Sequence, residues 1–381
     1  MARQDFQIPV CYTHRIVFTR DAFSTKNSTL ADIMAEGSGR RALVVMESPV
    51  ATAWPQITEE LECYFQDLNV ELKGVHTLPG GEVVKKDDLW VRETWQAIDG
   101  AHLDRHSYLI AIGGGAFLDA IGYGAATAHR GVRLIRFPTT TLSQDDSGVG
   151  VKCAINWFGK KNWIGSFHVP FAVINDFRFL HTQPEESRRA GLIEAIKVSL
   201  VKDHAFFEWI ESNIDALRNL EHEALEHCVE KSGLLHAEHI ATSGDPFESG
   251  SSRPLDFGHW SAHKLEALSD YNLSHAEAVG VGVALDALYS VKMGIAPPQL
   301  AERVITVIQS LGLHIHHPAL DWTHEDGSRQ VFGGIDEFRE HLGGELTVLM
   351  LQDIGKGLDI HEIDLEVMDA CIEELKQRNT A

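Results

Sequence analysis

Strand-like runs alternate with helical patterns through the first half of this chain, and that alternation limits the folds open to it. Four runs have the composition of buried strands: residues 41–46 (RALVVM), 108–115 (YLIAIGGG), 132–141 (VRLIRFPTTT, ended by Pro138) and 172–176 (AVIND). Between them, apolar residues recur at helical spacing over 51–68 and 117–129. Strands separated by helices predict a parallel sheet with right-handed crossovers, so we expect an α/β domain.

From about residue 185 the pattern changes to long helical segments. These are expected over 186–202, 204–217, 221–240, 258–269, 275–294 and 298–311, with one strand-like exception at 345–354. The chain has 381 residues, which exceeds an average domain and predicts two. We expect an α/β domain over 1–183 and a mainly α-helical domain over 184–381. A crevice between two such domains is a natural ligand site.

The acidic composition limits the partners of the chain. Its formal net charge of −22 argues against nucleic acid or an anionic membrane as a partner. No basic N-terminal segment precedes a long apolar run, and no apolar run reaches the roughly 18 residues of a membrane span. The five cysteines are scattered and odd in number, which is typical of reduced thiols and predicts a cytoplasmic protein.

A glycine-rich turn follows the second strand-like run. Gly113, Gly114 and Gly115 stand between that strand and the next helix, with Asp119 one turn further on. Glycines at this point let the backbone approach a pyrophosphate, and the helix N-terminus supplies N–H donors. The sequence is not GxGxxG, and a tight strand-to-helix turn needs glycine without any ligand. Glu47, at the end of the first run, is placed to bind ribose hydroxyls or to be a solvated loop residue.

A polar segment, residues 137–167, follows the third strand-like run. It is rich in Thr, Ser, Asp, Lys, Asn and Gly, and a second glycine pair occurs upstream in LPGGEVVKK (78–86). Carboxylates and amides would bind hydroxyls, and ammonium groups would bind phosphate. The candidates for binding a hydroxylated, phosphorylated ligand are Arg130, Asp146, Lys152, Lys160, Lys161 and Asn162. A surface loop with solvated lysines is the alternative.

Four residues in the second half have the chemistry and spacing of a divalent metal site. Glu194 lies in GLIEAIKVSL, on the same expected helical face as Lys197. His259 and His263 are four apart in DFGHWSAHKLE, and His275 follows in NLSHAEAVGVG. A carboxylate with imidazoles from separate segments can hold zinc and leave a coordination position open for substrate. Chance clustering is the alternative, because the chain has 21 histidines.

The order of these motifs resembles the dehydroquinate synthase family of sugar-phosphate cyclases. The resemblance covers roughly residues 40–355 and consists of GGGAFLD, AATAHRGV, PTTTLSQDDSGVGVKCAIN, GKKNWIGSF, AGLIEAIKVSL, LDFGHWSAH and LSHAEAVGVGVAL. It implies an NAD-binding α/β domain with a parallel sheet, a mainly α-helical metal-binding domain and one zinc (or cobalt) ion. It also implies a phosphorylated seven-carbon sugar as substrate and suggests a homodimer.

The resemblance also assigns roles by motif position. The metal ligands would be Glu194, His259 and His275, which leaves His263 to bind substrate phosphate. The catalytic residues would be Asp146, Lys152, Lys197 and His263. Substrate would be bound by Arg130, Asn162, Lys231, Arg253 and Asp256. The expected cofactor-binding residues are Glu47, Glu82, Lys85, Gly114, Gly115, Asp119, Thr139, Thr140, Lys161, Phe179 and Thr182.

These groups suit a phosphate-eliminating cyclase. In that reaction the metal binds two neighbouring hydroxyls, and NAD oxidises a carbinol to a ketone. The ketone acidifies the adjacent carbon, so phosphate leaves by β-elimination while cationic side chains bind its charge. The same cofactor returns the hydride, and ring opening with an intramolecular aldol step closes a carbocycle. The protein would be a carbon–oxygen lyase with no net redox change.

The chain departs from dehydroquinate synthase in the residues expected around a substrate carboxylate. Asp256 stands where the synthases have asparagine, Ser252 stands in the arginine position, and Arg253 follows one step later. An aspartate beside a substrate carboxylate is unfavourable, because like charges repel. Asp256 is similar to the cyclases that use sedoheptulose 7-phosphate, which has no carboxylate, so a substrate of that kind is expected.

Three alternatives stay open. The first is 3-dehydroquinate synthase itself, acting on 3-deoxy-arabino-heptulosonate 7-phosphate. The second is a metal-dependent polyol dehydrogenase of the glycerol type, which would release NADH. The third is a cyclase-derived binding protein, against which the presence of Lys152, Lys197 and the three metal ligands argues.

Overall fold

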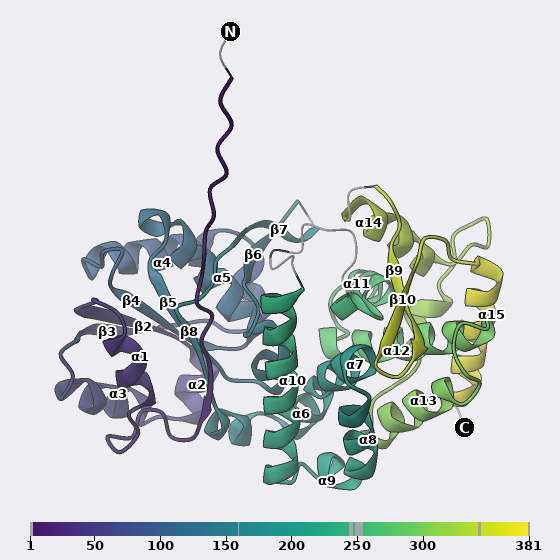
Figure 1. The fold of residues 1–381 in the computed structure, drawn as a ribbon, viewed down its shortest axis with the longest axis horizontal. Coiled ribbons are helices and arrows are strands. Elements are labelled where there is room, and N and C mark those ends of the chain that lie inside the picture. The colour runs from purple at the N-terminus through teal and green to yellow at the C-terminus, as the bar shows by residue number, and fades with distance from the viewer. Residues whose placement is uncertain (1–2, 159, 244–246, 248–253, 342–343, 380–381) are drawn as a thin grey trace. The chain divides into compact units, whose positions relative to one another are not determined.

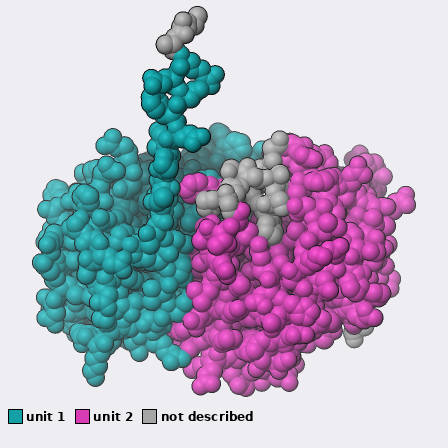
Figure 2. Space-filling view, in the orientation of Figure 1, with its two compact units in different colours: residues 1–138, 150–176 teal, residues 139–149, 177–381 magenta. Residues whose placement is uncertain are grey.

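The computed structural model describes residues 3–158, 160–243, 247, 254–341 and 344–379, and the chain divides into two compact units (Figures 1 and 2). Unit 1 comprises Met1–Pro138 and Gly150–Asp176, and unit 2 comprises Thr139–Val149 and Phe177–Ala381. Residues 139–149 therefore belong to unit 2, although they stand between two segments of unit 1 in the sequence. One reason is that Thr141 N donates a hydrogen bond to Gln183 Oε1 at 3.0 Å, which ties the insert to the start of the helical region.

Unit 1 is built on a six-stranded sheet in which every pairing is parallel. The strand order is β1 (Ile16–Thr19), β8 (Ala172–Asp176), β5 (Arg133–Pro138), β4 (Tyr108–Gly113), β2 (Arg41–Glu47) and β3 (Glu71–Leu78). The four predicted strands are confirmed as β2, β4, β5 and β8. Their residues are almost all buried, which is typical of a parallel sheet covered on both faces.

The crossover helices of unit 1 follow the predicted order with one difference. They are α1 (Thr29–Ala35), α2 (Ser48–Ala53), α3 (Ile57–Gln66), α4 (Leu89–Gly100) and α5 (Gly115–Thr127), with short turns η1 (Glu82–Lys85) and η2 (Ala128–Arg130). The single helix predicted over 51–68 is wrong, because α2 ends and α3 begins around Pro55. Proline restricts the residue before it to extended backbone, and Trp54 has ψ 73°.

The edge strands β1 and β3 and an antiparallel hairpin were not predicted. The hairpin is formed by β6 (Lys152–Trp157) and β7 (Lys160–Phe167), within the segment that was expected to bind a polar ligand or to be a surface loop. Its Ile155 is buried in the same apolar cluster as residues of β2, β4, α4 and α5, and Ile164 packs against that cluster. The hairpin is therefore attached to the core of unit 1 by one of its faces.

Unit 2 is mainly helical, as expected. Its elements are η3 (Ser143–Ser147), η4 (Phe177–Thr182), α6 (Glu185–Gly191), α7 (Ile193–Lys202), α8 (His204–Ser212), α9 (Ile214–Arg218), α10 (His222–Thr242), η5 (Pro254–Asp256), α11 (His259–Leu268), α12 (His275–Lys292), α13 (Leu300–Ser310), η6 (Pro318–Asp321), η7 (Gln330–Phe332), α14 (Gly333–His341), β9 (Val348–Asp353), β10 (Lys356–Ile360) and α15 (Leu365–Asn379). The strand predicted at 345–354 is confirmed as β9, which pairs antiparallel with β10. Among the described helices, none is both long and apolar enough to cross a bilayer.

Candidate functional site

Three helices of unit 2 bring the predicted metal ligands together. Glu194 lies on α7, His259 is the first residue of α11, and His275 is the first residue of α12. One ligand atom from each lies within 4.8 Å of the others, so the three side chains could hold one ion. Glu194 and His259 are buried and His275 is partly exposed, so the trio can be reached from one side.

Close backbone contact between α11 and α12 places the two histidines. Gly258, which precedes α11, has φ 79°, and a Cβ there would lie 2.7 Å from Val283 N. A Cβ on Gly282 of α12 would lie 2.0 Å from Gly258 O. Only glycine fits at both positions, so the backbones meet directly and His259 faces His275, with ring centroids 5.4 Å apart.

A buried aspartate fixes the start of α11. Asp286 of α12 accepts hydrogen bonds from Gly258 N at 3.0 Å and from Trp260 Nε1 at 2.9 Å. These donors flank His259 in the sequence. Burial raises the pKa of Asp286 to about 7, although the two hydrogen bonds act in the opposite direction. Asp286 therefore positions a metal-ligand candidate without reaching the metal position itself.

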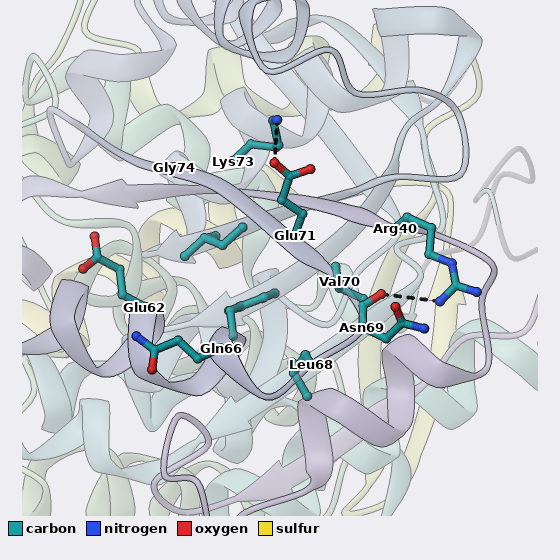
Figure 3. Close-up of a pocket in the computed structure, with 11 residues that line it drawn as sticks. Arg40, Glu62, Gln66, Leu68, Asn69, Val70, Glu71, Lys73 and Gly74 are labelled. Carbon is teal, nitrogen blue, oxygen red and sulfur yellow. Dashed lines mark hydrogen bonds and ion pairs between the residues drawn. The ribbon is translucent and has the colours of Figure 1, made fainter.

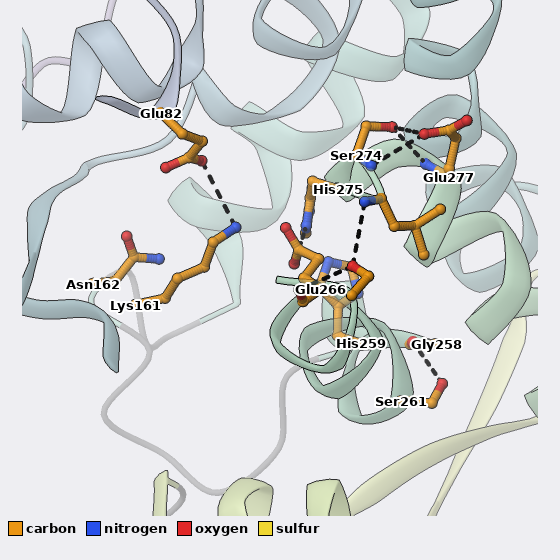
Figure 4. Close-up of polar contacts among 12 residues, drawn as sticks. Glu82, Lys161, Asn162, Gly258, His259, Ser261, Glu266, Ser274, His275 and Glu277 are labelled. Carbon is orange, nitrogen blue, oxygen red and sulfur yellow. Dashed lines mark hydrogen bonds and ion pairs between the residues drawn. The ribbon is translucent and has the colours of Figure 1, made fainter. Parts of the chain in front are cut away.

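Each imidazole has one nitrogen held by a neighbour (Figure 4). His259 Nδ1 lies 3.1 Å from Phe257 O, and His275 Nδ1 lies 3.1 Å from Glu266 Oε2. This pairing leaves Nε2 of both rings to bind a metal, as in carboxylate–histidine–metal triads. Burial, followed by the Lys197 ammonium, lowers the pKa of His259 well below its ordinary value, so the ring is neutral and can act as a ligand.

A capping box fixes the first turn of α12, where His275 lies. Ser274 Oγ accepts a hydrogen bond from Glu277 N at 3.3 Å, and Glu277 Oε2 accepts one from Ser274 N at 3.1 Å. The reciprocal pair satisfies backbone donors that the helix itself cannot. The sequence SHAE therefore both starts the helix and orients the ligand.

Buried charges surround the carboxylate ligand. Lys197 Nζ forms an ion pair with Glu194 Oε2 and lies 3.8 Å from Asp146 Oδ1. Burial raises the pKa of Glu194, which the Lys197 charge only partly opposes. Burial also acts to lower the pKa of Lys197, but Glu194 and Asp146 outweigh it and the pKa is raised. Lys197 therefore carries a positive charge at neutral pH.

The trio fits a divalent metal ion. Glu194 Oε1 is buried and has no hydrogen-bond partner among the described residues. A bound cation would satisfy it, and one carboxylate with two imidazole nitrogens is a donor set suited to zinc with an open position. His263, Glu266 and His275 form a second possible group, but it would use the carboxylate that already orients His275.

The sequence did not reveal His236 as a neighbour of Asp146, or Ser232 as a neighbour of Asp145. His236 of α10 lies with Nδ1 2.8 Å from Asp146 Oδ1, and one turn earlier Ser232 Oγ donates to Asp145 O at 3.3 Å. Lys197 and His236 outweigh burial and hold the pKa of Asp146 below its ordinary value. The i, i+4 spacing of Ser232 and His236 was the available signal, but nothing local showed that α10 packs on residues 145–146.

The predicted substrate-binding residues of unit 2 fall into different surroundings. Asp256 lies close enough for its charge to help raise the pKa of Lys197. His263 lies beside the trio, with its ring stacked on that of His275 at 5.9 Å between centroids. Lys231 instead forms an ion pair with Asp203 at 3.0 Å. Arg253 lies outside the described residues.

In unit 1, Glu47 joins the two glycine turns. Its Oε2 accepts a hydrogen bond from Gly114 N at 2.7 Å, and its Oε1 accepts one from Gly81 N at 2.9 Å. Gly114 is the N-cap of α5 and Gly115 is its first residue. Glu47 therefore fixes the shape of the turn, and each oxygen retains a lone pair for a ligand hydroxyl.

A polar cluster follows these turns. Lys85 Nζ donates to Asp119 Oδ2 at 2.6 Å and to Asn162 Oδ1 at 2.5 Å. Lys161 Nζ lies 3.7 Å from Glu82 Oε1 (Figure 4). Asn162 has φ 53°, which an asparagine tolerates better than most residues. Five residues assigned from separate motifs thus lie together. Lys152 and Arg130 are exposed residues of unit 1.

The remaining predicted cofactor residues belong to unit 2. Thr139 is buried, and Thr140 Oγ1 lies 2.9 Å from Ser143 Oγ at the start of η3. Thr182 Oγ1 donates to Phe179 O at 3.3 Å. Phe179 is buried, with the Arg178 guanidinium 5.2 Å from its ring centroid. Cofactor contact by these four residues stays a prediction.

A surface pocket of about 580 Å³ lies apart from the predicted site residues (Figure 3). It is lined by the end of α3 and the start of β3, including Glu62, Gln66, Glu71 and Lys73. None of its lining residues has a predicted role, and its walls carry an exposed Glu71–Lys73 pair at 2.9 Å.

Known proteins resemble the chain along most of its length. Residues 75–190 match the 3-dehydroquinate synthase N-terminal domain, and residues 191–329 match the C-terminal domain. The 3-dehydroquinate synthase of Halorhodospira halophila (strain DSM 244 / SL1) is 36% identical over 335 residues, covering 88% of this chain and 90% of that protein.

Solved structures share the fold at lower sequence identity. ValA, the 2-epi-5-epi-valiolone synthase of Streptomyces hygroscopicus subsp. jinggangensis 5008, has a TM-score of 0.87 and 24% identity, covering 98% of this chain and 100% of its own. A 2-deoxy-scyllo-inosose synthase has a TM-score of 0.77 and 21% identity, covering 94% of this chain and 96% of its own. A probable glycerol dehydrogenase from Sinorhizobium meliloti 1021 has a TM-score of 0.62 and 15% identity, covering 96% and 97%.

Both halves of one family match in order, and a curated relative matches over most of both chains. The chain therefore belongs to the 3-dehydroquinate synthase family, within the dehydroquinate synthase-like sugar-phosphate cyclases.

Proposed function

We propose that this protein is an NAD- and divalent metal-dependent sugar-phosphate cyclase that eliminates phosphate and closes a carbocycle. The observation that carries the proposal is the trio Glu194, His259 and His275, placed beside Lys197 in a chain of this family. ValA was solved with NAD⁺ and Zn²⁺ bound, and the 2-deoxy-scyllo-inosose synthase with carbaglucose-6-phosphate, NAD⁺ and Co²⁺. The general activity is thus a phosphate-eliminating lyase reaction.

Unit 2 would bind the metal and the reacting end of the sugar. A bound zinc or cobalt ion would hold neighbouring hydroxyls and polarise the carbinol that is oxidised. Lys197, kept positive by Glu194 and Asp146, would stabilise negative charge that develops on the substrate. Asp146, held ionised by Lys197 and His236, would accept a hydrogen bond from a sugar hydroxyl. His263 would bind the departing phosphate.

Unit 1 would bind the dinucleotide. NAD would take a hydride from the substrate and return it later in the same turnover. The N-terminus of α5 would face the pyrophosphate, and Glu47 would bind ribose hydroxyls while it holds Gly81 and Gly114. Two ion pairs lie in the adjoining cluster, Lys85 with Asp119 and Lys161 with Glu82. They would hold the side chains that line one side of the bound cofactor.

Further substrate contacts would come from Lys152, Asn162, Arg130 and Lys231. The protein would act as a homodimer. Lys152 and Asn162 would bind phosphate and hydroxyls. Lys231 would first have to leave Asp203, to which it is paired at 3.0 Å. A partly exposed ion pair of this kind is worth little, so its exchange for a phosphate contact is feasible.

The favoured substrate is a sedoheptulose 7-phosphate-like sugar. Asp256 carries its charge close to Lys197, and Asp146, whose pKa lies below its ordinary value, acts on the same ammonium. A substrate carboxylate placed there would meet further negative charge, whereas a hydroxymethyl ketone would not. This charge arrangement supports a substrate without a carboxylate.

The second candidate is 3-dehydroquinate synthase acting on 3-deoxy-arabino-heptulosonate 7-phosphate. It is favoured by the 36% identity to the Halorhodospira halophila enzyme of that name. The two candidates share the metal, cofactor and elimination chemistry, and they differ in the carboxylate of the substrate.

Phosphate release from the two sugars, measured side by side, tests the proposal. We expect faster release from sedoheptulose 7-phosphate, and we expect Asp256→Asn to shift the kcat/KM ratio toward the carboxylated sugar. Clear preference of the unmodified protein for the heptulosonate would overturn the substrate assignment and favour the second candidate. Unchanged phosphate release and metal content in Glu194→Ala would overturn the proposed site.

A further inference from the structure

An extended arm precedes the first strand of unit 1. Residues 3–13 are all exposed and belong to no helix or strand (Figure 1). Their apolar residues alternate with others, because Phe6, Ile8 and Val10 are 75%, 82% and 63% exposed and Tyr12 continues the series. An alternating sequence of this kind is typical of a strand with one apolar face. The arm leads directly into β1, so its base is anchored in the sheet.

The β6–β7 hairpin presents an apolar face of matching form. Ile164 packs inward, so the neighbouring positions Trp163, Gly165 and Phe167 face outward. Trp163 and Phe167 are 54% and 49% exposed, and Phe158 at the turn is 79% exposed. Phe158 lies against Trp163, with ring centroids 6.4 Å apart. The outer face of the hairpin therefore exposes several aromatic rings, two of which are in contact.

The backbone of β7 has one edge without a described strand on it. Among the residues that the structure describes, the hairpin sheet contains β6 and β7 alone. His168 N donates to Val151 O at 2.8 Å, so even-numbered positions point toward β6. By alternation, the N–H and C=O groups of Trp163 and Gly165 point to the opposite edge. These are the same positions whose side chains form the outer face.

The arm has the complementary pattern. In a strand, the backbone groups of Phe6, Ile8 and Val10 point to one edge and those of Gln7, Pro9 and Cys11 to the other. Pro9 has no N–H, so the edge that contains it cannot pair fully. The edge that can pair is the one whose side chains are apolar. Antiparallel pairing of this edge with the outer edge of β7 places both sets of apolar side chains on one sheet face.

Charge also favours this contact. The chain as a whole has a net charge of −22, so two copies repel each other over most of their surface. The arm residues 3–13 carry one arginine and one aspartate, and residues 152–167 carry three lysines and no acidic residue. Neither segment has a net negative charge, so a second acidic copy can approach the protein at these two segments with less repulsion.

From these observations we infer that residues 6–12 of one copy add to β7 of a second copy as a third, antiparallel strand. Every copy has one arm and one free hairpin edge, so a two-fold dimer would satisfy both twice without another partner. The contact buries Ile8 and its neighbours against Trp163 and covers the free edge of β7. Pro9 then lies on the new outer edge and blocks the addition of a further strand.

Photo-crosslinking between isotopically distinct copies tests the contact. Ile8→p-benzoylphenylalanine would be prepared in ¹⁴N and ¹⁵N forms of the full chain, which are equilibrated together and irradiated. We expect crosslinks from position 8 to the peptide that contains Trp163, with about half of them joining ¹⁴N to ¹⁵N peptides if copies pair at random. Same-isotope crosslinks alone would place the arm on its own hairpin and overturn the proposal, as would crosslinks to other regions.

Matched variants show which face and which edge are used. Gln7→p-benzoylphenylalanine points from the opposite face and should not crosslink to Trp163. In hydrogen exchange, the Ile8 and Val10 amides should be protected at high protein concentration and lose protection on dilution. Trp163→Asp should remove that protection, whereas Gln7→Asp should retain it. Protection that persists in Trp163→Asp, with thermal unfolding unchanged, would contradict the contact.

Discussion

At the scale of single residues, the candidate metal site depends on the buried carboxylate of Glu194, whose negative charge is stabilised by the neighbouring Lys197. Burial raises the pKa of Glu194, and the Lys197 ammonium is the nearest opposing influence. A buried ion pair that loses one member leaves an uncompensated charge, which costs far more than the pair contributes. A divalent ion bound to Glu194 would replace part of that compensation. The contribution of the Glu194–Lys197 ion pair to stability should therefore be larger in the metal-free protein than in the metal-bound protein.

Lys197→Met tests this dependence. We expect it to lower the free energy of unfolding of the metal-free protein by about 3–5 kcal/mol, because the Glu194 charge is left buried and unpaired. Added Zn²⁺ should recover much of the loss. Urea unfolding with chelator and with Zn²⁺ measures both. Lys264→Met, which removes an ion pair with the exposed Glu337, is the control and should cost about 1 kcal/mol or less. An equal loss with and without Zn²⁺ would contradict the assignment.

Glu266 is expected to orient a ligand rather than to bind the metal. It accepts the His275 Nδ1 contact at 3.1 Å, and outer partners of this kind typically change metal affinity by about 10–100-fold. Glu266→Gln should therefore weaken Zn²⁺ binding by that factor, measured by competition with a chromophoric chelator. His263→Ala should leave Zn²⁺ affinity nearly unchanged. If both variants abolish Zn²⁺ binding while Glu194→Ala retains it, the ion is held by His263, Glu266 and His275 instead.

Spacing made the candidate ligands visible in the sequence, and the family resemblance selected three of them. Glu194 with Lys197, and His259 with His263, share helical faces that the 3.6-residue period makes visible. His236 and Asp145 could not be found in the same way. Asp145 has buried carboxyl oxygens without a hydrogen-bond partner among the described residues, and burial, followed by Glu194, raises its pKa well above the ordinary value. Both residues acquire their neighbours only when η3 packs against α10.

At the scale of elements, the site depends on how closely α11 and α12 approach. Gly282→Ala would place a Cβ 2.0 Å from Gly258 O, so the helices would have to separate. We expect a loss of about 1–3 kcal/mol in the free energy of unfolding from this overpacking. The separation should also weaken Zn²⁺ binding, because His259 and His275 lie at the starts of the two helices. Chemical unfolding and chelator competition measure the two effects.

Gly280→Ala is the matched control on the same helix. A Cβ there would meet His314 O at 3.6 Å, which is an ordinary contact. The substitution should leave Zn²⁺ affinity unchanged and can raise stability by up to about 1 kcal/mol through helix propensity. Equal effects of the two alanines on metal affinity would show that close approach at Gly282 does not set the ligand geometry.

Prediction of the elements themselves worked best where burial is complete. The central strands β2, β4, β5 and β8 are nearly continuous apolar runs, so composition revealed them. The edge strand β3 (ELKGVHTL) is mostly partly exposed, and β1 has only four residues, so neither differs clearly from a loop. The β6–β7 hairpin was hidden because its lysines, asparagines and glycines give the segment a polar composition, which we interpreted as ligand-binding rather than as strand.

At the scale of the whole molecule, the chain divides differently from its sequence pattern. Composition changes near residue 183, but residues 139–149 pack with unit 2 although they directly follow β5 of unit 1. Such an exchange depends on tertiary contacts such as Thr141 with Gln183. The motif PTTTLSQDDSGVGVK therefore serves two units, with Asp146 in one and Lys152 in the other. The hydrophobic periodicity of a segment does not indicate which of two units the segment packs against.

The pH dependence of global stability should contain a separable contribution from Asp286. Its pKa rises from an ordinary value near 4 to about 7 in the folded protein, because burial disfavours its charge. Between these values the folded state retains a proton that the unfolded state has released. The contribution of Asp286 to stability is therefore fully present below about pH 4 and is lost as pH rises toward about 7. The upper limit of this loss is about 4 kcal/mol.

Asp286→Asn isolates this contribution from the general self-repulsion of an acidic chain. Asparagine cannot ionise, and its amide oxygen cannot serve both Gly258 N and Trp260 Nε1 as two carboxyl oxygens do. The variant should be less stable than the unmodified protein at pH 4–5, and the difference should shrink as pH rises toward about 7. Urea unfolding of both proteins across this range measures the difference, from which charge repulsion common to both cancels. Parallel stability curves across the range would mean that Asp286 is ionised in the folded protein, held by its two donors against burial.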